Sequence, residues 1–356
     1  MSGSPVSAMA PLRAQRCSRG SSIAAGYRLA ILEDVSAEAL VAQLHGDVTL
    51  ERGAPVRIEL DESLPASPGV AAHRLASLPF VVVGVTRGAV GEAWFDLCDV
   101  VVTEEDPALA HIERHLADHP IAATALALLL RGQVRRSVDD GLVAESATYS
   151  VLQSGPEFAA WRAANPARSD RDAGVRVRTE RSGDTLVITL ARPQRLNALD
   201  AQMRDELVDA LALAAADSDI ARVELRGEGR AFCAGGDLDE FGTRPDPATA
   251  HVVRLQRSVA RSLAWLETPT VTYLHGACIG SGIELAAFTD VVIAAEDTQI
   301  ALPEIGLGLV PGAGGTVSLP RRIRRLRTAW LAFSGCTIDA ATARTWGLVD
   351  EITTSA

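Results

Sequence analysis

The most constraining feature of this chain is a glycine-rich loop at residues 275–285, with a glutamate directly behind it. Gly280 and Gly282 are followed at the same two-residue spacing by Glu284. A second glutamate, Glu304, precedes another glycine-rich turn at 312–315. Glycine allows tight turns and close approach of backbones. The pattern therefore predicts one small site, built from turns in the second half of the chain.

Composition limits the kinds of partner that such a site can have. The chain has 356 residues, 47% of them apolar, which is enough for one large or two medium domains. Its net charge of −11 argues against sequence-independent binding to nucleic acid. No apolar run reaches membrane-spanning length. The five cysteines form no CxxC pair, so we expect neither a metal site nor a disulfide framework, and a reducing, cytoplasmic location.

The chain divides into two blocks. We predict a first block at residues 25–163, a polar linker at 164–173 and a second block at 174–356. Residues 1–24 are rich in Ser, Ala and Arg, and the first acidic residue is Glu33. This composition predicts a disordered leader, and an organelle transit peptide is the alternative.

The second block alternates strand and helix signals. Short strands are predicted at 175–179, 185–190, 223–225, 271–274 and 291–294. Helices are predicted at 200–215, with Asp200 as N-cap, and at 251–266. The alternation indicates an α/β fold.

Four segments in a fixed order make the second block resemble the crotonase (enoyl-CoA hydratase/isomerase) superfamily. They are residues 192–199, the turn Ala234-Gly235-Gly236-Asp237, the glycine-rich loop, and Pro303-Glu304 followed by 311–315. The resemblance covers about residues 174–352 and implies the ββα-spiral core of that superfamily.

The resemblance implies a role for each site residue. The backbone N–H groups of Gly236 and Ser281 would stabilise the enolate oxygen of a thioester, where losing one such donor costs about 3 kcal/mol. The family usually has glycine at the position of Ser281, but only the backbone N–H is needed. Glu284 would activate the water that adds at C3, and Glu304 would supply the proton to C2.

The substrate implied by the resemblance is an acyl-CoA. No metal and no cofactor are implied beyond the coenzyme A of the substrate itself, and no membrane or nucleic-acid partner is expected. The positions implied for coenzyme A binding are Arg195, Asn197, Ala198, Ala234 and Asp237. The arginines between Arg321 and Arg327 are predicted to form a solvated helix face, with one of them a candidate for a phosphate contact.

Two glutamates favour a hydratase, which adds water in syn fashion to a 2-enoyl-CoA or catalyses the reverse. A Δ3,Δ2-enoyl-CoA isomerase, which needs a single base, is the alternative enzyme. A non-catalytic acyl-CoA-binding or accessory subunit is the third possibility. A homo-oligomer is expected, either a trimer, a hexamer or a pseudo-symmetric assembly.

The second block departs from the family pattern at its end. The family continues into C-terminal helices that cover the acyl pocket, and these are absent after Ile352. Residues 119–158 of the first block resemble them. Residues 78–106 also weakly repeat 268–297, without the Gly-x-Gly-x-Glu core. We therefore predict that the first block is a degenerate crotonase-like α/β domain whose helices cover the site of the second.

Overall fold

The computed structural model describes residues 33–45, 55–69, 74–76, 78–168, 173–243 and 246–354. The predicted leader at 1–24 lies outside the described residues, as does most of the C-terminal part of the predicted linker.

The first half begins with a four-stranded parallel sheet in the order β1-β2-β3-β4. Its strands are β1 (Glu33–Asp34), β2 (Val56–Leu60), β3 (Val82–Thr86) and β4 (Val100–Thr103). Helix α1 (Ala37–His45) and the 3₁₀ helix η1 (Glu92–Leu97) connect them. Every residue of β3 is buried, as expected for a central parallel strand that is covered on both faces.

The second half contains a six-stranded sheet in the order β13-β10-β8-β7-β6-β5. All neighbours are parallel except β5 and β6, which form a hairpin. The strands are β5 (Val177–Ser182), β6 (Thr185–Leu190), β7 (Arg222–Gly227), β8 (Thr270–Leu274), β10 (Val291–Ala295) and β13 (Glu351–Thr353). A small sheet joins β9 (Ala277–Ile279), β11 (Gln299–Ala301) and β12 (Ile338–Asp339).

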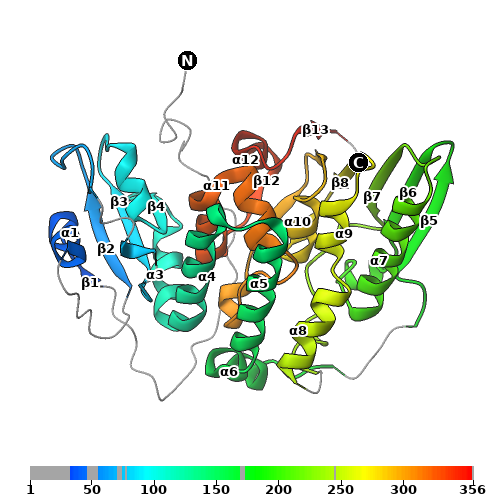
Figure 1. Cartoon of the computed structure of the whole chain (residues 1–356), viewed down its shortest axis with the longest axis horizontal. Helices are drawn as coiled ribbons and strands as arrows, with labels where there is room; N and C mark the ends of the chain where they lie inside the picture. Colours follow the sequence, from blue (N-terminus) through cyan, green and yellow to red (C-terminus); the bar gives the residue numbers. More distant parts are fainter. Residues whose placement is uncertain are drawn as a thin grey trace.

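Most of the helices lie between the two main sheets (Figure 1). Those of the first half are α3 (Leu109–Asp118), α4 (Pro120–Gly132), α5 (Val138–Gln153) and α6 (Pro156–Ala164). Those of the second half are α7 (Ala201–Ala216), α8 (Pro247–Gln256), α9 (Val259–Trp265), α10 (Ser281–Ala286), α11 (Gly315–Ser334) and α12 (Ala340–Trp346). The 3₁₀ helices η2 (Gln133–Arg135), η3 (Pro193–Arg195) and η4 (Glu304–Leu307) complete the set.

One hydrophobic core runs through both halves. Helices α3 and α4 pack on α11, and α5 packs on α8, α9 and α11. Buried residues of β3, β4, α3 and α4 belong to the same cluster as those of the six-stranded sheet. The helices of the first half that resemble the family's covering helices therefore pack directly on the second half.

The predicted strands and the helix at 200–215 are present, within two residues at most ends. The Asp200 carboxylate accepts from Met203 N at 2.8 Å and so caps α7, as expected. The single helix predicted at 251–266 is wrong, because the chain breaks into α8 and α9 at Arg257 and Ser258. Ser258 Oγ accepts from Arg261 N and starts a new helix there.

The two main sheets share a local hydrogen-bond pattern. In the first half, Val82 N donates to the Asp99 carboxylate at 2.8 Å. In the second half, Thr270 N donates to the Asp290 carboxylate at the same distance. In both cases the aspartate precedes the neighbouring parallel strand. This agrees with the weak sequence repeat, and the degenerate-copy origin of the first half stays a prediction.

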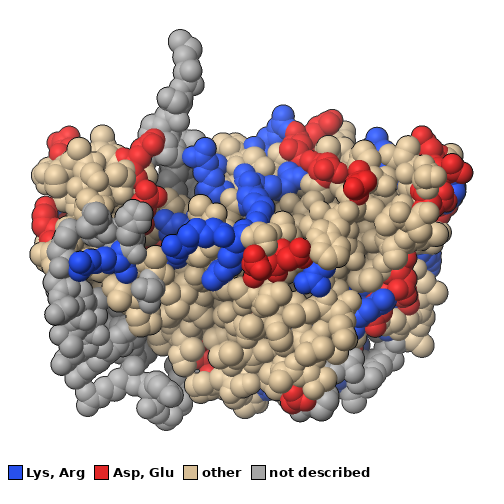
Figure 2. Space-filling model, in the orientation of Figure 1, with Lys and Arg blue, Asp and Glu red and all other residues tan. Residues whose placement is uncertain are grey.

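Basic side chains gather over the middle of the face shown in Figure 2, where α11 lies in Figure 1. Two arginines of α11 are not solvated as predicted. Arg325 donates to Cys98 O at 2.6 Å and to Phe95 O at 3.2 Å. Arg322 donates to Ala287 O. These arginines tie α11 to both halves. No helix among the described residues has the length and apolar character needed to cross a membrane.

Candidate active site

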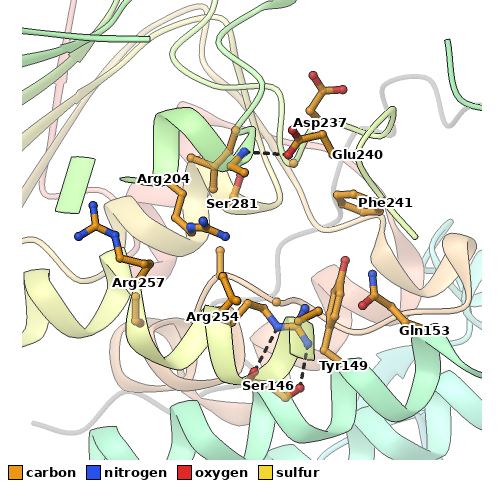
Figure 3. Close-up of a pocket in the computed structure, with 18 of the residues that line it drawn as sticks. Ser146, Tyr149, Gln153, Arg204, Asp237, Glu240, Phe241, Arg254, Arg257 and Ser281 are labelled. Atoms are coloured by element: carbon orange, nitrogen blue, oxygen red, sulfur yellow. Dashed lines mark hydrogen bonds between the residues drawn. The ribbon is translucent and has the colours of Figure 1, made fainter. Parts of the chain in front are cut away.

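A cavity of about 1210 Å³ lies between the two halves, and all four predicted reaction-centre residues line it. These are Gly236, Ser281, Glu284 and Glu304. Helices α5 and α6 of the first half supply the facing wall, with Glu145, Ser146, Tyr149, Gln153, Phe158 and Arg162 among its residues. Figure 3 shows this wall on α5, with Ser146, Tyr149 and Gln153 directed into the cavity. The site is therefore built by both halves of the chain.

The two predicted N–H donors lie on adjoining loops. Ile279 N donates to Cys233 O at 2.9 Å, which holds the glycine-rich loop against the Ala234–Asp237 turn. Among the described residues, neither Gly236 N nor Ser281 N donates to another group. Both amides are therefore available to an oxygen atom in the cavity. Ser281 Oγ lies 3.8 Å from Cys233 Sγ, so the serine side chain faces the neighbouring loop.

The close fit of these loops depends on Gly282. A Cβ at this position would lie 2.4 Å from Cys233 O, a backbone atom that cannot move independently. We expect Gly282→Ala to push the loops apart, to destabilise the fold by about 1–3 kcal/mol and to lower kcat/KM. Thermal unfolding and steady-state assays measure the two effects. The matched control is Gly306→Ala, because a Cβ there meets only His115 Nε2 at 3.8 Å. Equal effects of both substitutions would contradict this expectation.

Glu284 is 2% exposed and is held by the start of α11. Its Oε2 atom accepts from Ala313 N and Gly315 N, both at 2.8 Å. Backbone N–H donors at a helix N-terminus stabilise a carboxylate. These two hydrogen bonds therefore fix the position of Oε2 and the orientation of the whole carboxyl group.

Glu145 of α5 accepts hydrogen bonds from the N–H groups of the same segment that do not donate to Glu284. It is also 2% exposed, and its carboxylate accepts from Gly314 N at 2.7 Å, Thr316 N at 2.8 Å and Thr316 Oγ1 at 2.7 Å. Four successive backbone N–H groups thus donate in turn to Glu284 and Glu145. One glutamate comes from each half of the chain, so the α11 N-terminus joins the halves at the site.

Glu304 differs from the other two glutamates. It is 9% exposed, and among the described residues its buried Oε2 atom has no hydrogen-bond partner. The Oε1 atom lies against Gly280, where an added Cβ would come within 2.4 Å. The loop therefore packs against one carboxyl oxygen and leaves the other without a protein donor.

Burial raises the pKa of all three glutamates. It raises the pKa of Glu304 to about 8 and that of Glu145 to about 7, from an ordinary value of 4.5. The pKa of Glu284 is raised well above 4.5 by burial and then by the charges of Glu304 and Glu145. The N–H groups of Ala313 and Gly315 oppose this rise at Glu284. A group of buried carboxyls with raised pKa values can hold and transfer protons near neutral pH.

Most of the residues predicted to bind coenzyme A do not line the cavity. Of the five, Asp237 alone lines it. The Asn197 side chain is fully buried and bonds to Arg192 N, Glu228 O and Ala231 O. Asp237 accepts from Arg192 Nη1 at 2.7 Å. Arg195 lies 3.6 Å from Asp239. Ala198 and Ala234 donate their N–H groups to Arg195 O and Leu196 O. Their contact with coenzyme A stays a prediction.

The cavity residues of α5 were not among the site residues predicted from the sequence. Leu142, Glu145, Ser146 and Tyr149 are all buried and share one face of the helix at the spacing i, i+3, i+4, i+7. A glutamate in the middle of such a face is rarely buried without a partner. The position of Glu145 in the middle of this buried face is therefore the sequence feature that could have identified it as a site residue.

Comparison with known proteins bears on the second half of the chain. Residues 180–356 match the model of the enoyl-CoA hydratase/isomerase family. A probable enoyl-CoA hydratase of Mycobacterium bovis is 38% identical over 175 residues, which is 49% of this chain and 66% of that protein. The 1,2-epoxyphenylacetyl-CoA isomerase of Escherichia coli is 36% identical over 172 residues, 47% of this chain and 65% of that protein. The chain thus spans just under two thirds of the length of these relatives.

One chain of similar sequence has a solved structure. The enoyl-CoA hydratase of Thermoplasma volcanium is 36% identical, with a TM-score of 0.48, and the match covers 51% of this chain and 73% of that one. The relatives include both a hydratase and an isomerase, so the matches identify the family and not one reaction. By its second half, the chain belongs to the enoyl-CoA hydratase/isomerase family.

Proposed function

We propose that this chain is an enoyl-CoA hydratase, which adds water in syn fashion to a 2-enoyl-CoA thioester or removes it. The observation that carries the proposal is the pair of buried glutamates, Glu284 and Glu304, on the wall of the cavity that also holds the free amides of Gly236 and Ser281. The two carboxyls are near enough for the charge of Glu304 to raise the pKa of Glu284. Hydration needs a base and an acid on one side of a small substrate, and a carboxyl pair can divide these roles.

The hydrogen bonds favour a particular division of roles. Glu284 accepts two N–H bonds, which favour its ionised form, whereas Glu304 Oε2 accepts none among the described residues. Repulsion between the two carboxyls, which raises the pKa of Glu284, disfavours ionisation of both at once. Because the two N–H donors stabilise a charge on Glu284, we place the single charge there and the resting proton on Glu304. Glu284 takes a proton from water as the water oxygen bonds to C3, and Glu304 gives its proton to C2. Transfer of the proton from Glu284 to Glu304 restores the starting state.

Negative charge develops on the thioester oxygen during this addition. The N–H groups of Gly236 and Ser281 donate to that oxygen in the proposal, and Ser281 also lies at the N-terminus of α10. The reaction needs no cofactor, because coenzyme A is part of the substrate. Residues of α5 and α6 form one wall of the cavity, and this wall reduces the access of water to the reacting atoms in the proposal.

Absorbance of the conjugated enoyl-thioester tests the proposal. The purified chain is mixed with crotonyl-CoA and, separately, with a 3-enoyl-CoA. Loss of absorbance with crotonyl-CoA, and a product heavier by one water, is expected. A gain of absorbance with the 3-enoyl-CoA and no change with crotonyl-CoA would replace the hydratase by the Δ3,Δ2 isomerase. Acyl-CoA binding without either reaction would replace it by an accessory, non-catalytic role.

A further inference from the structure

Arg254 of α8 is a charged side chain in the cavity for which the proposed reaction has no role. Its Nε donates to Ser146 Oγ at 3.1 Å, and its Nη2 donates to Ser146 O and Ser150 Oγ. All of these acceptors are uncharged. Figure 3 shows the guanidinium inside the cavity, beside Tyr149 and close to the wall formed by α5.

Two other cavity arginines, Arg257 and Arg204, are compensated by carboxylates, whereas Arg254 is not. Arg257 pairs with Asp209 at 2.7 Å and Asp205 at 3.3 Å. Arg204 pairs with Asp205 at 2.7 Å. Within the part of the chain that the structure describes, Arg254 forms no ion pair. Its positive charge is supported by the Tyr149 ring, whose centroid lies 4.8 Å from the guanidinium carbon.

Burial is unfavourable for this charge. Loss of solvent lowers the pKa of Arg254, and the nearby charge of Arg204 lowers it further, while Tyr149 and Glu145 act in the opposite direction. Among the described residues Glu145 forms no ion pair with Arg254, and its oxygens accept from Gly314 and Thr316. Arg254 is partly buried, and a partly buried charge that no ion pair compensates is stabilised when a ligand supplies the opposite charge.

Four other carboxylates of the cavity wall are already engaged. Asp200 accepts from Arg176 Nε at 2.8 Å, and Asp237 accepts from Arg192. Glu240 accepts from Ala201 N at 2.7 Å, and Asp246 caps α8 through Thr249 N. None of these groups is directed to Arg254 by a hydrogen bond. The charge of Arg254 is therefore available to the contents of the cavity.

We propose that Arg254 selects acyl-CoA substrates whose acyl group carries an anion, most simply a carboxylate, at the end remote from the thioester. The inference rests on the proposed function and assigns its substrate class. The position of Arg254 follows from α5 and α8, which pack side by side (Figure 1). Ser146 and Ser150 orient the guanidinium, and Tyr149 covers one face of it. A guanidinium presents several N–H donors in a plane, which suits a carboxylate.

The test compares kcat/KM for pairs of 2-enoyl-CoA thioesters of equal chain length that end in a methyl or a carboxylate. Wild type is expected to prefer the carboxylate member of at least one pair by about tenfold or more. Arg254→Gln is expected to lower kcat/KM for that carboxylate substrate by about tenfold to a hundredfold. It is expected to change kcat/KM for the methyl substrate of the same length only slightly. Arg254→Lys, which keeps the charge, is expected to retain part of the preference.

The matched control is Arg261→Gln. Arg261 also reaches from the second half to α5, where it pairs with Asp139 at 3.0 Å, and it lies over Trp265, but it does not line the cavity. The control is expected to leave the preference intact. Hydration of the methyl substrates without any preference for carboxylates would overturn the inference and leave the proposed function standing. Equal losses on both substrates in Arg254→Gln would assign Arg254 to holding α5 and α8 together.

If Arg254→Gln fails to fold, binding of saturated acyl-CoA pairs to the wild-type chain decides the question. Calorimetry is expected to show tighter binding of the ω-carboxylate member, and this difference is expected to shrink as salt is added. Equal affinity for both members would overturn the inference. Absence of all turnover together with tight binding of the carboxylate member would contradict the proposed hydratase and support the anion site.

Discussion

Replacing Glu304 with glutamine is expected to lower the kcat of crotonyl-CoA hydration by about 10²–10⁴-fold, the usual contribution of a general acid or base. Glutamine keeps the size of the side chain but cannot give a proton to C2. KM is expected to change little, because the substitution removes a proton donor and no binding contact. Steady-state kinetics on matched preparations of wild type and variant measure both quantities. A kcat within about tenfold of wild type would assign the proton transfer to another group.

The same substitution is expected to raise stability, and the gain is expected to grow with pH. The pKa of Glu304 is about 8 in the folded chain and 4.5 ordinarily. Between pH 4.5 and pH 8 the folded state therefore binds more protons than the unfolded state. The free energy of unfolding of wild type therefore falls as pH rises through this window. Glutamine does not titrate, so the difference from wild type widens from pH 4.5 to pH 8. Denaturant unfolding at several pH values measures it, and a constant difference would contradict the raised pKa.

Removing the Glu145 side chain is expected to have the largest effect on stability. Glu145→Ala leaves Gly314 N, Thr316 N and Thr316 Oγ1 without their acceptor inside the core. Each unsatisfied buried donor costs about 1–3 kcal/mol, so with three donors we expect a loss of at least about 3 kcal/mol in the free energy of unfolding. Chemical denaturation measures this loss. The start of α11 is also expected to shift, which lowers kcat because Glu284 accepts from the same segment.

Glu157→Ala is the control for this experiment. Glu157 also accepts from two backbone N–H groups, those of Ile121 at 2.8 Å and Ala122 at 3.0 Å, but it joins α6 to α4 within the first half. It is half-buried, so water can replace it, and we expect a loss of about 1 kcal/mol with kcat retained. A kcat loss in Glu157→Ala as large as in Glu145→Ala would show that both act only through general stability.

Local patterns in the sequence predicted the second half well. The strands at 185–190 and 271–274 read as apolar runs and are present as β6 and β8. The Asp200 cap was predictable because N-capping is decided within one helical turn. The grouping of Glu284, Glu304, Gly236 and Ser281 on one cavity followed from the resemblance, and the structure brings these residues together. The break between α8 and α9 was missed because the apolar period continues through it.

Long-range contacts lay beyond sequence patterns. Glu145 and Gly314 are separated by 169 positions, and no periodicity or spacing relates them. Arg254 reads in sequence as one polar residue of a helix, and its charge gained significance only when α5 placed serines and Tyr149 around it. In the same way, Arg325 read as solvated and is instead bonded to Cys98 O of the first half.

The sequence by itself therefore determined the α/β character of the second half, its turns and its glutamate pair. These depend on backbone geometry and hydrophobic periodicity over a few residues. Tertiary structure alone decided which helices close the cavity and which charges remain uncompensated inside it. Both depend on the packing of segments distant in the chain, where burial and the choice of hydrogen-bond partner set the free energy of each group.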